Sequence, residues 1–358
     1  MKISFFIGST SGGGAERVVC NLANRLVSDK YEVQILTVKN CDSYGLDSRI
    51  ECISLEKGSK EKNRYLKKIE KLYKLKLFMK RNKTNLYIVF LPVEICMFMH
   101  YRKYTDAPIV LSERNDPASY SKIMQLLLRH YASRAKGMVF QTEEARQWYQ
   151  LESGVHTAVI PNPISIEFIA GEGINTRNRN GDIIGVGRLS KQKNWEMLLN
   201  AYARLPDAFK AHKLVIYGQG EEEKRLKQLS EKLNIREYVH FPGFCRSIKD
   251  VLKEAALFVL SSNYEGMPNV LMEAMAVGLP CIATNCPVGG PAFLIQPDEN
   301  GMLVEVGNCR ELTDAMTILL NDPGKADRMG MEAKKIGERL HPEKIYSMWK
   351  MFIQDQSI

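Results

Sequence analysis

The sequence lacks several patterns that mark common functional classes. Its eight cysteines contain no C-x-x-C pair, so neither a zinc site nor a dithiol redox site is indicated. No secretory signal precedes them, and we therefore expect reduced thiols, as in a cytosolic protein. The longest apolar stretch, residues 86–101, is interrupted by Pro92 and Glu94, which argues against a membrane-spanning helix. Low-complexity runs and internal repeats are also missing.

Two glycine-rich nucleotide motifs are absent as well. Residues 9–14 read STSGGG, between an expected strand at residues 2–8 and an expected helix at residues 15–28. Arg17 stands where G-x-G-x-x-G needs its last glycine, and no G-K-[ST] follows, so this is neither a dinucleotide fingerprint nor a Walker A loop. Three glycines before a helix still let a ligand approach free N–H groups. A plain tight turn is the alternative interpretation.

Acidic residues are scarce in the first half of the chain. Residues 1–165 contain 26 Lys and Arg against 16 Asp and Glu, a net +10, whereas the remainder contains 24 against 25, a net −1. Within residues 57–83 there are 12 Lys or Arg and only two acids. Apolar residues recur there at helical spacing, which predicts a basic amphipathic helix over residues 60–81. Such a helix either packs as a solvated face of its own domain or binds a membrane surface.

The 358 residues are enough for two domains of ordinary size. Strands and helices alternate in both halves, which predicts an α/β fold with two doubly wound, Rossmann-like domains. The turn Pro161-Asn162-Pro163, followed by a polar stretch up to Asp182, predicts a linker. The predicted domains are therefore residues 1–163 and 164–341. Further expected strands are residues 31–38, 86–91, 108–111, 137–141, 183–186, 213–217, 239–241 and 302–304, and the last expected helix is residues 341–353.

Residues 259–284, reading VLSSNYEGMPNVLMEAMAVGLPCIAT, contain the densest set of candidate site residues. Pro268 suits the first turn of a helix, Gly278 suits the position after its end, and Pro280 forbids continuation, so we expect a helix of about ten residues. Glu273 is the only charge beyond its first turn. A helix that is apolar on all sides is buried, so this carboxylate needs a partner.

Glu265 lies in the turn before the same helix. The N–H groups of Asn269 and Val270 and the positive end of the helix dipole favour an anion at this position. Two carboxylates beside it could accept hydrogen bonds from sugar hydroxyls. The alternative is a Glu bonded to neighbouring backbone in an ordinary αβ unit.

This E-x7-E arrangement, EGMPNVLME, resembles the signature of family 4 of the glycosyltransferases, which have the GT-B fold. The resemblance implies that Glu265 contacts the donor sugar and Glu273 the ribose of the nucleotide. It also implies that Met267, Asn269 and Val270 belong to the same donor site.

Two further segments of the second half are similar to the family. The sequence GRL followed by Lys193 resembles the diphosphate clamp, in which Arg188 and Lys193 would hold the nucleotide phosphates. Gly243 and Phe244 would lie where the family binds the base. The alternative interpretation of Arg188 and Lys193 is that both are ordinary loop cations exposed to solvent.

The first half carries the acceptor side of the resemblance. GGGAERV looks like the family's N-terminal loop, with Gly13 toward the acceptor and Gly14 toward the donor. Glu113 and Arg114 follow an apolar strand at the ligand-binding edge of the expected sheet. Many family members have a His near this position, where this chain has Arg114. The basic helix adds three candidate acceptor contacts: Lys67, Lys68 and Lys71.

The resemblance implies a GT-B enzyme whose two domains face each other across a cleft, with residues 342–358 crossing back to the N-terminal domain. The implied reaction is retaining transfer of a hexose from a UDP-sugar to a glycan hydroxyl, with Glu265, Arg188 and Lys193 as catalytic residues. No D-x-D sequence occurs, so we expect no metal, and no cofactor other than the sugar donor. Bacterial members often extend glycans on polyprenyl diphosphate. This implies a cytoplasmic enzyme, peripheral on the inner face of the cell membrane, with a lipid-linked acceptor.

Two other functions are compatible with the sequence. A nucleotide-sugar epimerase of the same fold would convert the donor alone. The pI of about 9.0 would also suit a nucleic-acid-binding protein. Against the latter, the basic residues are concentrated in one helix without stacking aromatics on exposed loops, so we expect no nucleic-acid partner.

Overall fold

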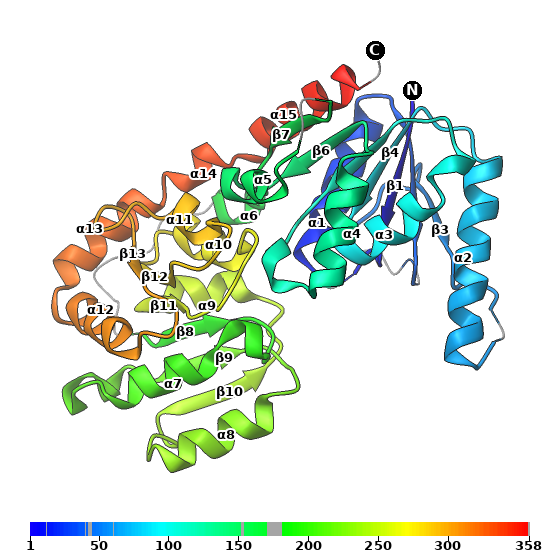
Figure 1. Cartoon of the computed structure of the whole chain (residues 1–358). Coiled ribbons are helices and arrows are strands. Elements are labelled where there is room, and N and C mark those ends of the chain that lie inside the picture. Colours follow the sequence, from blue (N-terminus) through cyan, green and yellow to red (C-terminus); the bar gives the residue numbers. More distant parts are fainter. Residues whose placement is uncertain are drawn as a thin grey trace. The chain divides into compact units, whose positions relative to one another are not determined.

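The computed structural model describes residues 1–11, 13–39, 41, 45–59, 61–151, 154–169 and 181–356. The chain divides into two compact units. The first unit comprises Met1–Asn162 and Ile345–Ile358, and the second comprises Pro163–Lys344. Each is built on one parallel sheet with helices around it (Figure 1). The prediction of two doubly wound α/β domains is confirmed.

The first unit contains a seven-stranded sheet in the order β3-β2-β1-β4-β5-β6-β7. Its central strands are buried on both faces, which is why they appear in the sequence as apolar runs. The direction of winding reverses between β1 and β4, so the loops after these two strands border the usual ligand site of such a sheet. The strands are β1 (Lys2–Ile7), β2 (Glu32–Thr37), β3 (Glu51–Ser54), β4 (Leu86–Phe90), β5 (Ile109–Ser112), β6 (Gly137–Phe140) and β7 (His156–Val159).

The last helix of the chain packs on the first sheet. Trp349 is 1% exposed and stacks on Phe90 of β4, with ring centroids 6.0 Å apart. The Tyr346 hydroxyl donates to Asp29 at 2.8 Å, just after α1. The helices of this unit are α1 (Gly14–Ser28), α2 (Arg64–Arg81), α3 (Pro92–His100), α4 (Lys122–Ala132), α5 (Glu143–Tyr149) and most of α15 (Pro342–Asp355), with short turns η1 (Arg102–Tyr104) and η2 (Pro117–Ser119).

The second unit has a six-stranded sheet in the order β10-β9-β8-β11-β12-β13, and its winding reverses between β8 and β11. Trp195 and Tyr202 of α7 are among the large side chains of its core. The strands are β8 (Ile183–Val186), β9 (Leu214–Tyr217), β10 (Val239–Gly243), β11 (Leu257–Leu260), β12 (Cys281–Thr284) and β13 (Met302–Val304). The helices are α6 (Ile166–Ile169), α7 (Trp195–Ala203), α8 (Glu223–Lys232), α9 (Ile248–Glu254), α10 (Asn269–Ala276), α11 (Gly290–Leu294), α12 (Cys309–Asn321), α13 (Pro323–Ala333) and α14 (Ile336–Arg339), with short turns η4 (Lys191–Lys193) and η5 (Asp207–Ala211).

Several predicted boundaries are corrected by the structure. The basic helix begins at Arg64, because the Asn63 side chain accepts the N–H groups of Tyr65 and Leu66 and caps it there. Lys60, its predicted first residue, lies outside the described residues. In the predicted linker, α6 was not expected, and residues 170–180 are not described. No helix of the described chain is both long and apolar enough to span a membrane.

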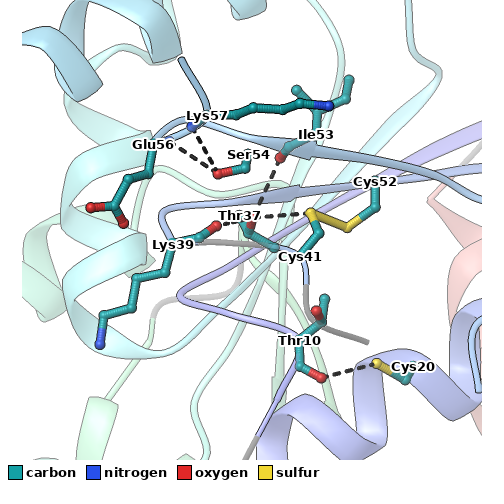
Figure 2. Close-up of a disulfide and its surroundings, with 10 residues drawn as sticks. All are labelled: Thr10, Cys20, Thr37, Lys39, Cys41, Cys52, Ile53, Ser54, Glu56 and Lys57. Carbon is teal, nitrogen blue, oxygen red and sulfur yellow. Dashed lines mark hydrogen bonds between the residues drawn. A yellow bond between two sulfur atoms is a disulfide. The ribbon is translucent and has the colours of Figure 1, made fainter. Parts of the chain in front are cut away.

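The expectation of eight reduced thiols is wrong for two of them. Cys41 and Cys52 form a disulfide with a Cα–Cα distance of 6.2 Å (Figure 2). Cys52 lies on β3, which pairs with β2, and Cys41 follows β2 closely in the chain. Because β3 is short and only half-buried, its sequence did not predict a strand. The two cysteines come close together only because β3 pairs with β2. The other six cysteines take part in no disulfide within the described chain.

Candidate functional site

The loops that follow β8 and β11 form one connected structure at the carboxyl edge of the second sheet. The Asn263 N–H donates to the Gln192 carbonyl at 2.8 Å. The Asn194 side-chain amide donates to the Asn263 side-chain oxygen at 2.9 Å. Because β8 and β11 are neighbours at the reversal of winding, these loops occupy the position where parallel sheets bind ligands.

Two of the predicted catalytic residues meet in this structure. The Lys193 ammonium lies 2.6 Å from Glu265 Oε1, and both side chains are largely buried, at 14% and 9% exposure. The Ser262 hydroxyl donates to the same carboxylate oxygen at 2.6 Å, and the Ser261 hydroxyl donates to the Lys193 carbonyl at 2.9 Å. A charge buried to this degree needs its partner, because removing one member of such a pair costs about 3–5 kcal/mol.

Arg188 belongs to the same loop but does not join this pair. Its side chain is exposed, while its carbonyl accepts the Trp195 indole N–H at 2.9 Å. The backbone around it is tightly packed: a Cβ at Gly218 would lie 1.9 Å from the Gly187 carbonyl oxygen. The loop is therefore held firmly by its backbone while the guanidinium group extends into solvent.

The helix α10 behaves largely as the sequence predicted. Its residues 271–276 are buried, and Glu273 among them is only 5% exposed. It has eight residues, not ten, and Pro268 is its N-cap and not part of its first turn. Gly278 follows the helix with φ +80°, the conformation expected for that position.

The remaining predicted donor residues surround the same edge. Asn269 and Val270 open α10 and are half-buried, whereas Met267 before it is 6% exposed. Gly243 ends β10, and its carbonyl accepts the Gly218 N–H at 2.8 Å, next to the loop of Arg188. Phe244 is 74% exposed. Every predicted donor residue except Gly14 thus belongs to the second unit.

The predicted residues of the first unit lie in three places: at the start of α1, in the loop after β5 and on α2. Gly13 is the N-cap of α1 and Gly14 its first residue, so both lie at the carboxyl end of β1. Glu113 is 1% exposed, and its carboxylate accepts the Arg114 N–H at 2.9 Å and the Tyr149 hydroxyl at 3.0 Å. Burial raises the pKa of Glu113. Glu113 therefore braces the loop after β5 from inside the unit.

Arg114 is enclosed in the same way. Its guanidinium lies over the rings of Phe90 and Trp349, 5.2 and 5.3 Å from their centroids. It donates to the Asn162 side-chain oxygen at 3.1 Å, and burial lowers its pKa to about 9. The side chain thus ties α15 to the end of the first unit, and its contact with an acceptor stays a prediction.

The three predicted lysines of α2 differ in their surroundings. Lys67 and Lys71 both form ion pairs with Glu56, the second at 3.4 Å. Lys68 is exposed and has no ion pair within the described chain. The helix packs on its unit through Leu75 and Met79, which are both buried. Large apolar residues of its first half are instead exposed: Tyr65, Leu66, Ile69 and Tyr73.

One titratable residue near the first sheet was overlooked as a candidate. Glu94 lies in the first turn of α3, after β4, and its Oε1 is 2.7 Å from where a Cβ on Gly8 would be. Burial raises its pKa to about 7, and the nearby Glu16 adds to the shift. Its position directly after an apolar strand was the available signal. Among the described residues, no group of three or more His, Cys, Asp or Glu could hold a metal.

Two protein-family models match the chain. The model described as Glycosyltransferase Family 4 matches residues 12–168, and the model described as Glycosyl transferases group 1 matches residues 172–336. Together they cover most of both units.

Two Campylobacter jejuni enzymes are similar along nearly the whole chain. N-acetylgalactosamine-N,N'-diacetylbacillosaminyl-diphospho-undecaprenol 4-alpha-N-acetylgalactosaminyltransferase is 30% identical over 342 residues, 90% of each chain. GalNAc-alpha-(1->4)-GalNAc-alpha-(1->3)-diNAcBac-PP-undecaprenol alpha-1,4-N-acetyl-D-galactosaminyltransferase is 26% identical over 361 residues, 99% of each chain.

A solved structure shares the fold. HepE of Anabaena, crystallised with UDP, superposes with a TM-score of 0.78 at 19% identity, covering 99% of this chain and 100% of that one. Given the family models and a relative 30% identical across nine-tenths of both chains, the protein belongs to glycosyltransferase family 4 and is a glycosyltransferase with the GT-B fold.

Proposed function

We propose that the enzyme transfers a hexose from a UDP-sugar to a hydroxyl of a lipid-linked glycan, with retention of configuration and without a metal ion. The observation that carries the proposal is the ion pair of Lys193 with Glu265, which lies just before the N-terminus of α10. The UDP bound by HepE and the undecaprenyl-diphosphate acceptors named for the two Campylobacter enzymes support it. Those names also make N-acetylhexosamine donors the first to test.

The proposed chemistry follows from the charges at this edge of the sheet. The Lys193 ammonium contacts the Glu265 carboxylate on one side. A phosphate oxygen of the nucleotide could contact the same ammonium in a similar way. We propose that Lys193 and the exposed Arg188 stabilise the negative charge that develops on the leaving diphosphate, together with the N–H groups that open α10. Glu265 then orients the donor sugar and Glu273 the ribose. The leaving phosphate accepts the proton of the acceptor hydroxyl.

The first test uses the isosteric change Glu265→Gln, which removes the charge and keeps the shape. We expect transfer to an undecaprenyl-diphosphate-linked oligosaccharide to fall by about 10²–10³, because one transition-state partner is lost. Products from a panel of UDP-sugars are measured by mass spectrometry, and melting temperature checks the fold. Glu237→Gln, at an exposed carboxylate of the same unit, is the matched control. Activity of Glu265→Gln within a few fold of the wild type would remove Glu265 from the site.

The second test asks whether transfer requires a metal ion. If Arg188, Lys193 and the helix amides provide the charge stabilisation, turnover is unchanged by EDTA. Rates are compared before and after chelation and after adding back manganese. Loss of activity on chelation, restored by manganese, is the contrary result.

We further propose that α2 holds the enzyme on an anionic membrane surface. Its exposed apolar residues recur at helical spacing, with Ile69 62% and Tyr73 58% exposed, and lysines flank them. Such a face can bury shallowly among headgroups while the lysines are attracted by about 1 kcal/mol each. The ion pairs of Lys67 and Lys71 with Glu56 reduce this attraction. Of the three predicted contacts, Lys68 is the one that forms no ion pair with the described residues.

Vesicle flotation tests this membrane proposal. We expect binding to anionic vesicles at low salt, release as salt screens the charges, and loss of binding in the triple variant Tyr65→Ser, Ile69→Ser, Tyr73→Ser. Met331→Ser, at an exposed apolar residue of the second unit, is the control. Equal flotation on neutral vesicles, or none on anionic ones, would contradict the proposal.

A further inference from the structure

Glu94 lies where the winding of the first sheet reverses, and the proposed reaction leaves it without a role. β4 ends at Phe90, and Glu94 follows in the first turn of α3. Because β1 and β4 are neighbours in the sheet, the loops after them border the position at which parallel sheets bind ligands (Figure 1). Val93 beside it is 52% exposed and Glu94 itself is half-buried, so this turn lies at the surface of the unit.

The carboxylate lies against the backbone at the end of β1. Gly8 follows this strand, and a Cβ there would be 2.7 Å from Glu94 Oε1 and 3.6 Å from its Cδ. Apart from the chain neighbours of Gly8, these are the only atoms of the described residues that such a Cβ would meet within 4 Å. Glycine at this position therefore leaves the space that the carboxylate occupies.

The turn that carries Glu94 begins with an unfavourable backbone conformation. Leu91, the N-cap of α3, has φ +72° and ψ 148°, a combination essentially restricted to glycine. Its N–H donates to the Ser112 carbonyl at 3.3 Å, and its carbonyl accepts the Ile95 N–H at 2.9 Å, so β5 and α3 hold it there. Such strain persists where it orients a functional side chain, and the side chain oriented here is that of Glu94.

The Glu94 carboxylate forms no ion pair within the described chain. It accepts a hydrogen bond from its own backbone N–H, and burial raises its pKa to about 7. Two charged groups of neighbouring elements act on it: Glu16 of α1 raises the pKa further, and Lys39 after β2 lowers it. Cys96 on the same helix stays neutral at this pH, because its own pKa is raised to about 11. A carboxylate in these surroundings destabilises the fold when it is charged, which points to a function.

We propose that Glu94 binds the acceptor, its carboxylate accepting a hydrogen bond from a hydroxyl of the sugar that receives the transferred hexose. A sugar hydroxyl is uncharged and donates to a carboxylate in a charge-assisted hydrogen bond, which is about twice as strong as a neutral one. The charged form of Glu94 therefore binds the acceptor, and protonation competes with binding. This inference rests on the proposed function, since it names an acceptor contact of the same reaction.

The pH dependence of transfer tests the role of the charge. With an undecaprenyl-diphosphate-linked oligosaccharide as acceptor, we expect its KM to rise about tenfold as the pH falls from about 8 to about 6, because Glu94 is protonated around pH 7. Glu94→Gln has the high acceptor KM at both pH values, while its KM for the UDP-sugar stays that of the wild type. Glu51→Gln, at the exposed first residue of β3, is the matched control and keeps the wild-type profile.

Gly8→Ala tests the geometry separately. The added methyl group displaces the flexible carboxylate and leaves its charge in place. We expect the acceptor KM at about pH 8 to rise about tenfold in Gly8→Ala. In a Glu94→Ala background, where the methyl group meets no carboxylate, Gly8→Ala has no further effect.

Melting temperatures test the cost of the buried charge without any substrate. Because the pKa of Glu94 is raised above the ordinary value for Glu, the wild type loses stability as the pH rises through 7. Glu94→Gln should therefore melt at a higher temperature than the wild type at about pH 8. The difference shrinks as the pH falls and Glu94 becomes neutral.

The outcomes separate this inference from the proposed function. A wild-type protein that transfers from no UDP-sugar overturns the proposed function, and the acceptor role of Glu94 falls with it. If the wild type is active, three results overturn the inference alone. They are an acceptor KM of Glu94→Gln within twofold of the wild type at about pH 8, an acceptor KM of Glu94→Gln that still rises as the pH falls, and an equal rise of the acceptor KM in Glu51→Gln.

Discussion

The buried ion pair between Lys193 and Glu265 is the interaction on which the arrangement of the donor edge depends. A carboxylate at 9% exposure cannot stay charged alone, and the ammonium that neutralises it comes from a loop 72 residues earlier in the chain. Hydrogen bonds from Ser262 to the carboxylate and from Ser261 to the Lys193 backbone fix both partners. The pair, together with the hydrogen bonds of Asn263 to Gln192 and Asn194, therefore joins the loops after β8 and β11 just before α10.

The first unit distributes its charges differently at its two sheet edges. At the carboxyl edge, Glu113 and Arg114 are buried within the unit, while Glu94 lies half-buried beside the β1 loop with a pKa raised to about 7. At the amino edge, Arg102, Lys103, Arg134 and Lys136 line a hollow and form no ion pair with a carboxylate of the described chain. Of the predicted lysines of α2, two are paired with Glu56. The large positive charge of this half is thus partly neutralised by nearby carboxylates.

Much of the fold could be predicted because apolar runs, glycines and prolines act locally. The burial of α10 and of Glu273 followed from a helix without a polar face, and Gly278 followed from the conformation that a helix end requires. What could not be predicted depends on contacts distant in sequence. The strand β3 and the Cys41–Cys52 pair need the alignment of β2 with β3, and the stacking of Arg114 on Trp349 needs the last helix to return to the first sheet. The sequence shows that α2 has apolar residues, but which of them the rest of the unit covers depends on tertiary packing; Leu75 is covered and Ile69 is not.

The central claim is that Arg188 and Lys193 hold the diphosphate of the donor, and calorimetric titration with UDP tests it most directly. The account predicts that Arg188→Ala and Lys193→Ala each raise the Kd for UDP by about 10- to 100-fold, as expected for the loss of one charge-assisted hydrogen bond. Lys191→Ala, at an exposed cation of the same loop, should bind UDP like the wild type. Arg188 is exposed, so its variant tests binding without disturbing the fold. Unchanged UDP affinity in both Arg188→Ala and Lys193→Ala would contradict the account.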